Sequence, residues 1–191
     1  MSLKAPIAQF FETDFPLNKE GLEELLGSFK MRHISKGRIL LNEGEQEQSL
    51  RFLNRGLIRE YYISNKKEIN INFYTRPQFI TDFSSFMHSH ATRKNQESLS
   101  ELELLELGKE KFMALLEKYS CGKSFINLTF QKLLQQKELF EYNRATKEAE
   151  QLYKELQIYK AQWLQQIPQY HIASYLGVTP ETLSRIRKRI S

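Results

Sequence analysis

The sequence contains one cysteine, Cys121, among its 191 residues. A single thiol cannot form a disulfide within the chain, and it cannot supply the ligand set of a zinc finger or of a cysteine-bound iron–sulfur cluster. A disulfide framework and a cysteine-held metal are therefore excluded within one copy of the chain. The shortage of cysteine also suits the reducing cytoplasm, where we expect the protein to reside.

Long apolar runs are lacking as well. No stretch approaches the roughly 18 apolar residues that a membrane span requires, and the first residues, MSLKAPIAQFF, do not combine a cationic start with a long apolar segment. We therefore expect neither secretion nor membrane insertion. A glycine-rich phosphate loop and a Ser/His/Asp arrangement with a recognisable local signature are also missing, so we expect no enzyme activity and no cofactor.

Histidine is scarce, and one pair, His88 and His90, has the His-x-His spacing of a metal site. Cupin enzymes, which share a β-roll shape, begin their metal site with such a pair. A cupin adds a glutamate shortly afterwards and a later histidine, but Glu97 is too distant and His171 lies in another part of the chain. We interpret the pair as two loop residues without a metal, and a cupin-like metalloenzyme stays an alternative.

Positive charge is present and unevenly distributed. Hydrophobic residues make up 40% of the sequence, which suits one moderate domain or two small ones, and the formal net charge is +5. From Pro168 onward four cations accompany one carboxylate, a net charge of +3 that leaves +2 for the rest of the chain. This distribution indicates an anionic partner for the C-terminal segment.

The C-terminal segment has the pattern of a helix-turn-helix. A first helix is predicted from about Pro168 to Leu176, and Gly177 supplies a turn that favours a left-handed backbone. Thr179 is the predicted cap of a second helix, with Pro180 at its first position. Apolar residues fall where two helices that cross steeply face each other. These residues are Ile172, Ala173, Leu176, Val178, Leu183 and Ile186.

The second predicted helix has two chemically different faces. At about 100° per residue its apolar residues cluster on one side, while polar and charged residues point away from them. An arginine can bond guanine twice, a glutamate can accept from cytosine, and flanking cations can bind phosphates. A solvated helix surface is the ordinary interpretation of such a face, but the cap and turn glycine favour a DNA-reading helix. We predict base contacts from Glu181, Ser184 and Arg185, and phosphate contacts from Thr179, Thr182, Arg187, Lys188 and Arg189.

The pattern of apolar residues in the first half of the chain changes near Lys36. Residues 1 to about 30 are predicted to be helical, with Asn18 as a helix cap. Short apolar runs then alternate with glycine or polar turns, which predicts an antiparallel β-sandwich or roll with a hairpin turn over Ser64–Lys67. The predicted strands include Ile39–Leu41, Leu50–Leu53, Leu57–Ile63 and Ile69–Phe73.

A long helix is predicted from Gly122 to about Tyr142. Its apolar residues recur every seven positions, which is typical of a helix that pairs with a second copy, although packing against the roll explains the periodicity equally well. Thr146 is the predicted cap of a further helix from Lys147 to Gln166. The long helix carries its stripe at Ile126, Phe130, Leu133, Leu134 and Phe140, and the further helix supplies core at Leu152, Tyr153, Leu156, Tyr159 and Trp163.

Two segments, KGRILLNEGE (residues 36–45) and SLRFLNRGLI (residues 49–58), resemble the start of the cyclic-nucleotide-binding β-roll. That roll is the sensor domain of the Crp/Fnr family of bacterial transcription regulators. Together with the helix-turn-helix, the resemblance spans nearly the whole chain. It implies that residues 99–107, which composition alone assigns to a helix, form the closing strand of the roll, before a short helix over residues 109–119.

The resemblance implies an α+β fold: an N-terminal antiparallel β-roll (double-stranded β-helix or jelly roll) with flanking helices over residues 1–120, a dimerisation helix over 121–145, and a helix-turn-helix domain over 146–191. Because the sequence given ends at Ser191, we expect that domain to lack a following wing. The implied partners are a second copy of the chain, a pseudo-palindromic operator in double-stranded DNA, a small-molecule effector and RNA polymerase. The implied dimer contacts are Ile126, Phe130, Leu133 and Phe140.

The ligand cassette departs from the family pattern. Cyclic-nucleotide binders carry Gly-Glu-Leu and then Arg-Ser near the end of the roll, where this chain has Thr81-Asp82-Phe83 and Thr92-Arg93-Lys94. Without the glycine the backbone cannot approach a phosphate closely, so we do not expect cyclic nucleotide binding. An effector pocket, if the chain uses one, is predicted at Thr81, Asp82, Phe83 and Arg93. A ligand-binding module without DNA function stays an alternative.

Overall fold

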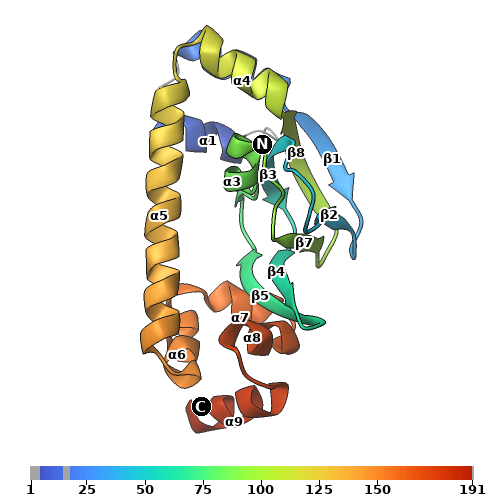
Figure 1. Ribbon diagram of the computed structural model, residues 1–191, viewed down its shortest axis with the longest axis vertical. Coiled ribbons are helices and arrows are strands. Elements are labelled where there is room, and N and C mark those ends of the chain that lie inside the picture. Colours follow the sequence, from blue (N-terminus) through green and yellow to red (C-terminus); the bar gives the residue numbers. More distant parts are fainter. Residues whose placement is uncertain (1–4, 15–17, 191) are drawn as a thin grey trace.

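The computed structural model describes residues 5–14 and 18–190 of the chain. Two antiparallel sheets form a β-roll, helices flank it, and a long helix, α5, leads from the roll to a group of C-terminal helices (Figure 1). The expected α+β architecture with antiparallel sheets and flanking helices is therefore confirmed. None of the helices in the described ranges is long and apolar enough to cross a membrane.

The helices and strands have the following bounds. The helices are α1 (Ala5–Asp14), α2 (Lys19–Ser28), α3 (Phe83–His88), α4 (Lys109–Lys118), α5 (Gly122–Thr146), α6 (Ala149–Tyr159), α7 (Ala161–Gln166), α8 (Gln169–Leu176) and α9 (Pro180–Ile190). The strands are β1 (Lys30–Ile34), β2 (Ile39–Leu41), β3 (Ser49–Arg55), β4 (Ile58–Ser64), β5 (Lys67–Tyr74), β6 (Gln78–Phe79), β7 (Asn95–Ser98) and β8 (Leu102–Gly108).

The strands form two four-stranded sheets, in the orders β1-β8-β3-β6 and β2-β7-β4-β5. Apolar side chains from both sheets, among them Leu53, Ile58 and Leu104, are fully or almost fully buried in the roll. The turn between β3 and β4 requires glycine, because Gly56 has φ +116° and a Cβ there would lie 2.5 Å from the carbonyl oxygen of Glu101. The resemblance implies a closing strand over residues 99–107, and residues 102–107 of that segment lie in β8.

The predicted hairpin turn joins β4 and β5. Asn65 and Lys66 form the turn with φ +50° and +63°, and positive φ at both central residues is typical of the turns whose twist matches a two-stranded hairpin. Strand β5 pairs with β4 on one side and is the outer strand of its sheet on the other. The free edge of β5 is therefore available to another element.

Helices α1–α4 pack on one end of the roll. Aromatic rings dominate their shared core: Phe11 from α1, Phe52 from β3, Phe86 from α3 and Phe112 from α4 are all buried. Asn18 caps α2 by accepting the backbone N–H of Gly21 at 2.8 Å, as the sequence predicts. This layer anchors the chain just before α5 begins.

The boundaries of the C-terminal helices correct two predictions. Helix α5 continues to Thr146, whose hydroxyl donates to the carbonyl of Tyr142 at 2.7 Å inside the last turn, so Thr146 is not the cap of the next helix. Glu148 has that role, in a capping box with Gln151. The predicted continuous helix is also interrupted at Lys160, which separates α6 from α7.

Tyr159 was predicted in the core, and this is wrong because its side chain is 80% exposed. Helix α6 ends at Tyr159, and the chain changes direction there. Its side chain therefore does not follow the helical spacing that would place it on the buried side. The other four predicted core residues of the segment are buried, as expected: Leu152, Tyr153, Leu156 and Trp163.

Candidate nucleic-acid interface and sensor interior

Helices α8 and α9 are joined by a tight turn of three residues that begins with Gly177. Gly177 has φ +73° and ψ +25°, the left-handed conformation that ends helices at lowest cost with glycine. Its N–H bonds the carbonyl of Ser174 at 3.1 Å, and the N–H of Val178 bonds the carbonyl of Ala173 at 3.0 Å. The turn therefore has the geometry predicted from the sequence.

Thr179 caps α9. Its hydroxyl oxygen accepts the backbone N–H of Thr182 at 3.2 Å, and its carbonyl accepts the N–H of Leu183 at 3.0 Å. Leu183 and Ile186 face inward and are 1% and 3% exposed, and Ala173 of α8 is completely buried. The side of α9 that faces α8 is thus occupied by its core, and the opposite side is free to contact another molecule.

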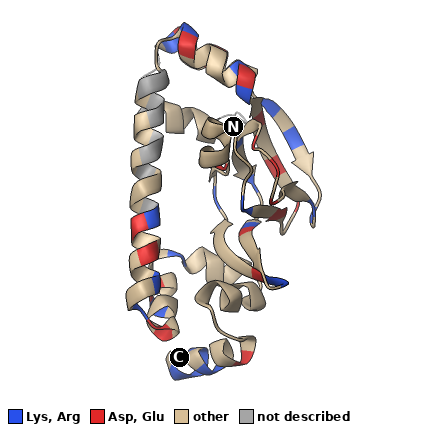
Figure 2. Cartoon of the chain, in the orientation of Figure 1, with Lys and Arg blue, Asp and Glu red and all other residues tan. Residues whose placement is uncertain are grey.

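The outward side of α9 carries most of the predicted base-reading and phosphate-binding residues. Glu181, Ser184, Arg185 and Lys188 are exposed, and Figure 2 shows lysine and arginine along this helix. The backbone N–H of Glu181, the Thr179 hydroxyl and the charge of Arg185 lower the pKa of the Glu181 carboxyl below its ordinary value. Glu181 is therefore an ionised hydrogen-bond acceptor at neutral pH.

The predicted phosphate-binding cations of α9 lie on two different sides of the helix. Arg185, Lys188 and Arg189 line an open hollow of about 500 Å³ together with Thr182, whose hydroxyl lies 3.4 Å from Arg185. Arg187 instead lines a second hollow, of about 340 Å³, between α9 and the three preceding helices. Its position, only about 40° around the helix from Leu183, explains this difference. Arg187 is therefore on a different side of α9 from the other cations.

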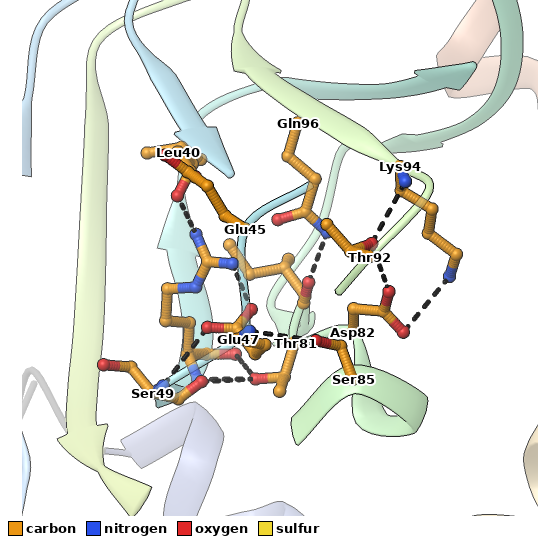
Figure 3. A network of polar contacts seen from close by, with 12 residues as sticks. Leu40, Glu45, Glu47, Ser49, Thr81, Asp82, Ser85, Thr92, Lys94 and Gln96 are labelled. Carbon is orange, nitrogen blue, oxygen red and sulfur yellow. Dashed lines mark hydrogen bonds and ion pairs between the residues drawn. The ribbon is translucent and has the colours of Figure 1, made fainter. Parts of the chain in front are cut away.

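The interior of the roll holds a buried ion pair near the predicted effector site. The guanidinium of Arg51 bonds the carboxylate of Glu47, and both residues are at least 96% buried. Arg51 also donates to the carbonyl of Leu40 at 3.0 Å. Its backbone N–H bonds the hydroxyl of Thr81 at 2.7 Å, and that hydroxyl lies 3.3 Å from the carbonyl of Ser49 (Figure 3).

A second group of polar side chains adjoins this pair. Asp82 accepts the hydroxyl of Thr92 at 2.6 Å and lies 3.8 Å from the ammonium of Lys94, which also lies 3.6 Å from Glu60. Gln96 donates to Glu60 at 3.1 Å. Burial favours the neutral form of Lys94, but the carboxylates of Glu60 and Asp82 outweigh it and raise the pKa of Lys94 above its ordinary value. Lys94 is therefore charged.

The predicted effector residues have three different environments. Thr81 and Asp82 belong to the buried polar network, whereas Phe83 packs against the aromatic core, 6.1 Å from Phe79 between ring centroids. Arg93 is exposed to solvent. Sequence reasoning missed the partners that complete the network, because Arg51 and Glu60 lie within strands that read as ordinary β-structure, while Lys94 and Gln96 lie beside or in β7, which local patterns do not predict. These missed residues are Glu47, Arg51, Glu60, Lys94 and Gln96.

The His-x-His pair lies at the end of α3. His88 is the last residue of that helix, and His90 follows it with its Nε2 at 2.9 Å from the hydroxyl of Ser84. The two imidazole rings stack with centroids 6.4 Å apart. Among the residues that the structure describes, no three His, Cys, Asp or Glu side chains are grouped closely enough to hold a metal ion.

Helix α5 exposes large apolar side chains. Leu134, Leu139 and Tyr142 are 62%, 61% and 58% exposed. Of the predicted dimer contacts, Leu133 and Phe140 are half-buried. The side chains of Ile126 and Phe130 lie outside the described residues, so their prediction stands as made.

Comparison with known proteins finds a family profile that matches the roll. The family profile described as "Cyclic nucleotide-binding domain" matches residues 31–119. The catabolite activator protein of Thermus thermophilus is 17% identical, with 91% of this chain and 84% of that chain covered and a TM-score of 0.56. The c-di-GMP-responsive global regulator CLP of Xanthomonas campestris is 14% identical, with 91% of each chain covered and a TM-score of 0.66.

A third solved structure matches a smaller share of the chain. The PKA regulatory domain of Toxoplasma gondii with cAMP is 16% identical over 63% of this chain, at a TM-score of 0.55, and the match spans 46% of that chain. No curated protein sequence matches the chain. At these identities the similar structures show the fold. Residues 31–119 are therefore similar to cyclic nucleotide-binding domains, and the chain shares the fold of the catabolite activator protein and of CLP.

Proposed function

We propose that the protein is a sequence-specific DNA-binding transcription regulator of the Crp/Fnr type, without enzyme activity. Residues Thr179 to Ile190 form its recognition helix and enter the major groove as the second helix of a helix-turn-helix. The observation that carries this proposal is the outward side of α9, where the ionised Glu181 and the guanidinium of Arg185 are exposed side by side on a helix whose other side is its core.

The roles of individual residues follow from their positions on α9. Glu181, Ser184 and Arg185 lie in the N-terminal half of the helix, which enters the groove most deeply in helix-turn-helix proteins, and they read bases. Flanking groups bind phosphates and fix the register without reading sequence. These groups are Thr179, Thr182, Lys188 and Arg189, with Arg187 on the side nearer the other helices.

The roll has a closed polar interior that does not suit a cyclic nucleotide. Three carboxylates, Glu47, Glu60 and Asp82, accompany the two cations Arg51 and Lys94, a net charge of −1 around the predicted pocket. An entering phosphate would meet these carboxylates and would have to displace hydrogen bonds that are already made. We therefore propose that cyclic nucleotides are not the effector, and that any effector is another small molecule.

Helix α5 is the proposed dimerisation helix. Leu128 packs against the core of its own protomer, and Leu139 lies only about 20° from it around the helix, so this side of α5 faces the roll. Leu134 is about 120° away from Leu128, on the opposite side from Leu139. Its position on the helix is only about 40° from that of Phe130 in the predicted stripe. A second copy that packs on this other side covers the stripe and places two recognition helices on one two-fold axis.

The homodimer geometry predicts the form of the DNA target. Two recognition helices on a two-fold axis meet half-sites about 34–36 Å apart, so the operator is roughly palindromic. RNA polymerase is a further partner for a regulator that acts at promoters. Selection of bound duplexes from a random pool tests the proposal, and enrichment of two inverted half-sites about one helical turn apart is the expected result.

The second candidate function is a ligand-binding module without DNA function. The family profile, which is confined to residues 31–119, and the similarity to a kinase regulatory domain favour this alternative. A selection that enriches no sequence, with no salt-dependent binding to random duplex, would establish it. Stoichiometric iron, zinc or manganese in the purified protein would instead favour a cupin-like enzyme at His88 and His90.

A further inference from the structure

The free edge of β5 is covered by α8. Because β5 is the outer strand of its sheet, the backbone N–H and C=O groups along this edge need partners other than a neighbouring strand. Helix α8 lies directly against the strand (Figure 1). The element that covers the sensor sheet is therefore the first helix of the proposed DNA-binding pair.

Ser174 of α8 makes the central polar contact with this edge. Its hydroxyl donates to the carbonyl of Glu68 at 2.9 Å and accepts the backbone N–H of Asn70 at 3.1 Å. These two groups flank Ile69, and a residue of a parallel neighbouring strand would bond the same two groups. A single hydroxyl thus takes the place of one residue of an added strand.

Side chains of β5 extend the contact into the C-terminal helices. The amide of Asn70 lies 3.3 Å from Nδ1 and 3.4 Å from the carbonyl oxygen of His171, and both residues are buried. The ring of Phe73 packs edge-on against Trp163 with centroids 5.0 Å apart, and it lies 6.1 Å from the ring of Tyr175. Phe73 belongs to the same buried cluster as the C-terminal helices. The sensor sheet and the C-terminal helices therefore share one core.

The end of α5 holds α8 from another direction. The guanidinium of Arg144 donates to the carbonyl of Tyr175 in the last turn of α8. It also lies over the rings of Phe140 and Tyr175, 5.3 Å and 5.4 Å from their centroids. A Cβ at Gly177, where the turn to α9 begins, would lie 3.4 Å from this guanidinium. The proposed dimerisation helix thus contacts the turn itself.

We infer that α8 is the coupling element of the protein. The edge of β5 holds it through Ser174, and α5 holds it through Arg144, so the sensor and the dimerisation helix together set the orientation of α9. Ser174 and Arg144 are then positioning residues for DNA recognition: they contact no base, but they decide whether both recognition helices of a dimer meet their half-sites at once. This inference rests on the proposed DNA-binding function.

The test uses the full-length protein with Ser174→Ala and the conservative variant Ser174→Thr. Amide hydrogen exchange of Asn70, measured without DNA, is expected to accelerate roughly fivefold in Ser174→Ala, as the loss of one neutral hydrogen bond implies, and to be restored in Ser174→Thr. On the duplex selected by the wild-type protein, Ser174→Ala should bind roughly fivefold more weakly, with binding to random duplex unchanged. Arg144→Ala should show the same loss on the selected duplex with unchanged exchange at Asn70.

Each outcome decides a separate point. Unchanged exchange at Asn70 in Ser174→Ala would overturn the contact between Ser174 and the sheet edge as a holding interaction. Equal weakening on selected and random duplex would overturn the positioning role. If the wild-type protein binds neither duplex, the DNA-binding proposal and the positioning role fail together, while the exchange measured without DNA still shows whether Ser174 holds α8 on the sensor sheet.

Discussion

The guanidinium of Arg189 on α9 lies 2.9 Å from the carboxylate of Glu150 at the start of α6. Glu150 also lies 3.1 Å from the ammonium of Lys154. A cation that binds phosphate in the proposed complex therefore has a carboxylate partner in the free protein. Because both side chains are partly exposed, the pair adds little to stability, but in the proposed complex it would compete directly with DNA for Arg189.

Replacing Glu150 by glutamine should strengthen DNA binding. Glu150→Gln releases Arg189 and removes a negative charge that repels phosphates, so affinity for random duplex is expected to rise about two- to fivefold, the range of an exposed ion pair. Fluorescence anisotropy at moderate salt measures the change. Glu110→Gln on α4, which removes the same charge far from α9, is the control, and an equal gain in both variants would contradict a local competition.

Truncation of Arg185 and truncation of Lys188 should weaken DNA binding in different ways. Arg185→Ala is expected to cost about 1–3 kcal/mol on the selected duplex and to relax preference at one base position, because it removes a base contact. Lys188→Ala is expected to weaken all sequences alike and to reduce the salt slope by about one, because it removes a phosphate contact. Anisotropy on selected and random duplex over a salt series distinguishes the two.

Arg55→Ala is the matched control for these variants. Its side chain is 82% exposed on the roll, and its truncation removes the same charge at a distance from α9. Binding of Arg55→Ala is expected to equal that of the wild-type protein. Identical losses for Arg185→Ala and Lys188→Ala on both duplexes would refute the division between base reading and phosphate binding.

Two leucines of α5 provide a matched test of the dimer interface. Leu134 and Leu139 are 62% and 61% exposed, but only Leu134 lies beside the predicted stripe, because Leu139 is on the side of α5 that faces the roll. Leu134→Glu should place a charge in the interface and yield monomers in sedimentation, as should Leu133→Glu, whereas Leu139→Glu should stay dimeric. Dimers for Leu134→Glu and monomers for Leu139→Glu would move the interface to the opposite side.

His171 should make the protein less stable in mild acid. Burial, followed by the nearby charge of Arg59, lowers the pKa of His171 from 6.5 to about 4. A histidine that binds its proton less tightly when folded favours unfolding as the pH falls, so stability is full above about pH 6.5 and is lost towards pH 4. The free energy of unfolding should fall by roughly 1–2 kcal/mol from this group between pH 7 and pH 5.

Urea denaturation of wild type and His171→Gln at both pH values measures this contribution. Glutamine keeps a hydrogen-bond acceptor for Asn70 but does not titrate, so the fall in the free energy of unfolding should be smaller in the variant. Its absolute stability at pH 7 does not enter the comparison. Equal falls in both proteins would show that His171 does not titrate in this range.

The buried pair of Arg51 and Glu47 should be sensitive to the loss of one partner. Glu47→Ala leaves the guanidinium buried without its carboxylate, which is expected to lower the free energy of unfolding by about 3–5 kcal/mol. Glu43→Ala, which removes an exposed carboxylate nearby, should change it by less than about 0.5 kcal/mol. Chemical denaturation measures both, and similar small effects would mean that the interior of the roll is more open to water than the structure indicates.

Local signals in the sequence predicted the C-terminal helices and strands β2 to β5, whereas β8 was implied only by the family resemblance. Gly177 and Thr179 were predictable because their roles depend on backbone conformation and on neighbours within three residues. Strand β7, with the sequence NQES, was not predicted, because Asn95, Gln96 and Ser98 are buried by polar partners and present no apolar alternation. The exposed Tyr159 shows the same limit, since periodicity does not reveal where a helix stops.

Contacts between segments far apart in the chain could not be predicted from local sequence patterns. Ser174 and Asn70 are 104 residues apart, and their bond depends on an exposed backbone edge that follows from the order of strands in the sheet. The pairing of Arg189 with Glu150 likewise requires the relative placement of α6 and α9. The chemistry of the proposed DNA-reading side could thus be predicted from the sequence, but the contacts that position and restrain it could not.

The most direct test of the proposed function is a salt titration of DNA binding by the wild-type protein. Anisotropy with the selected duplex and with random duplex is measured at low and at moderate salt. A regulator with several phosphate contacts should bind both with a steep salt slope and prefer the selected duplex by about 10³-fold or more at moderate salt. No binding to either duplex at low salt would contradict the account.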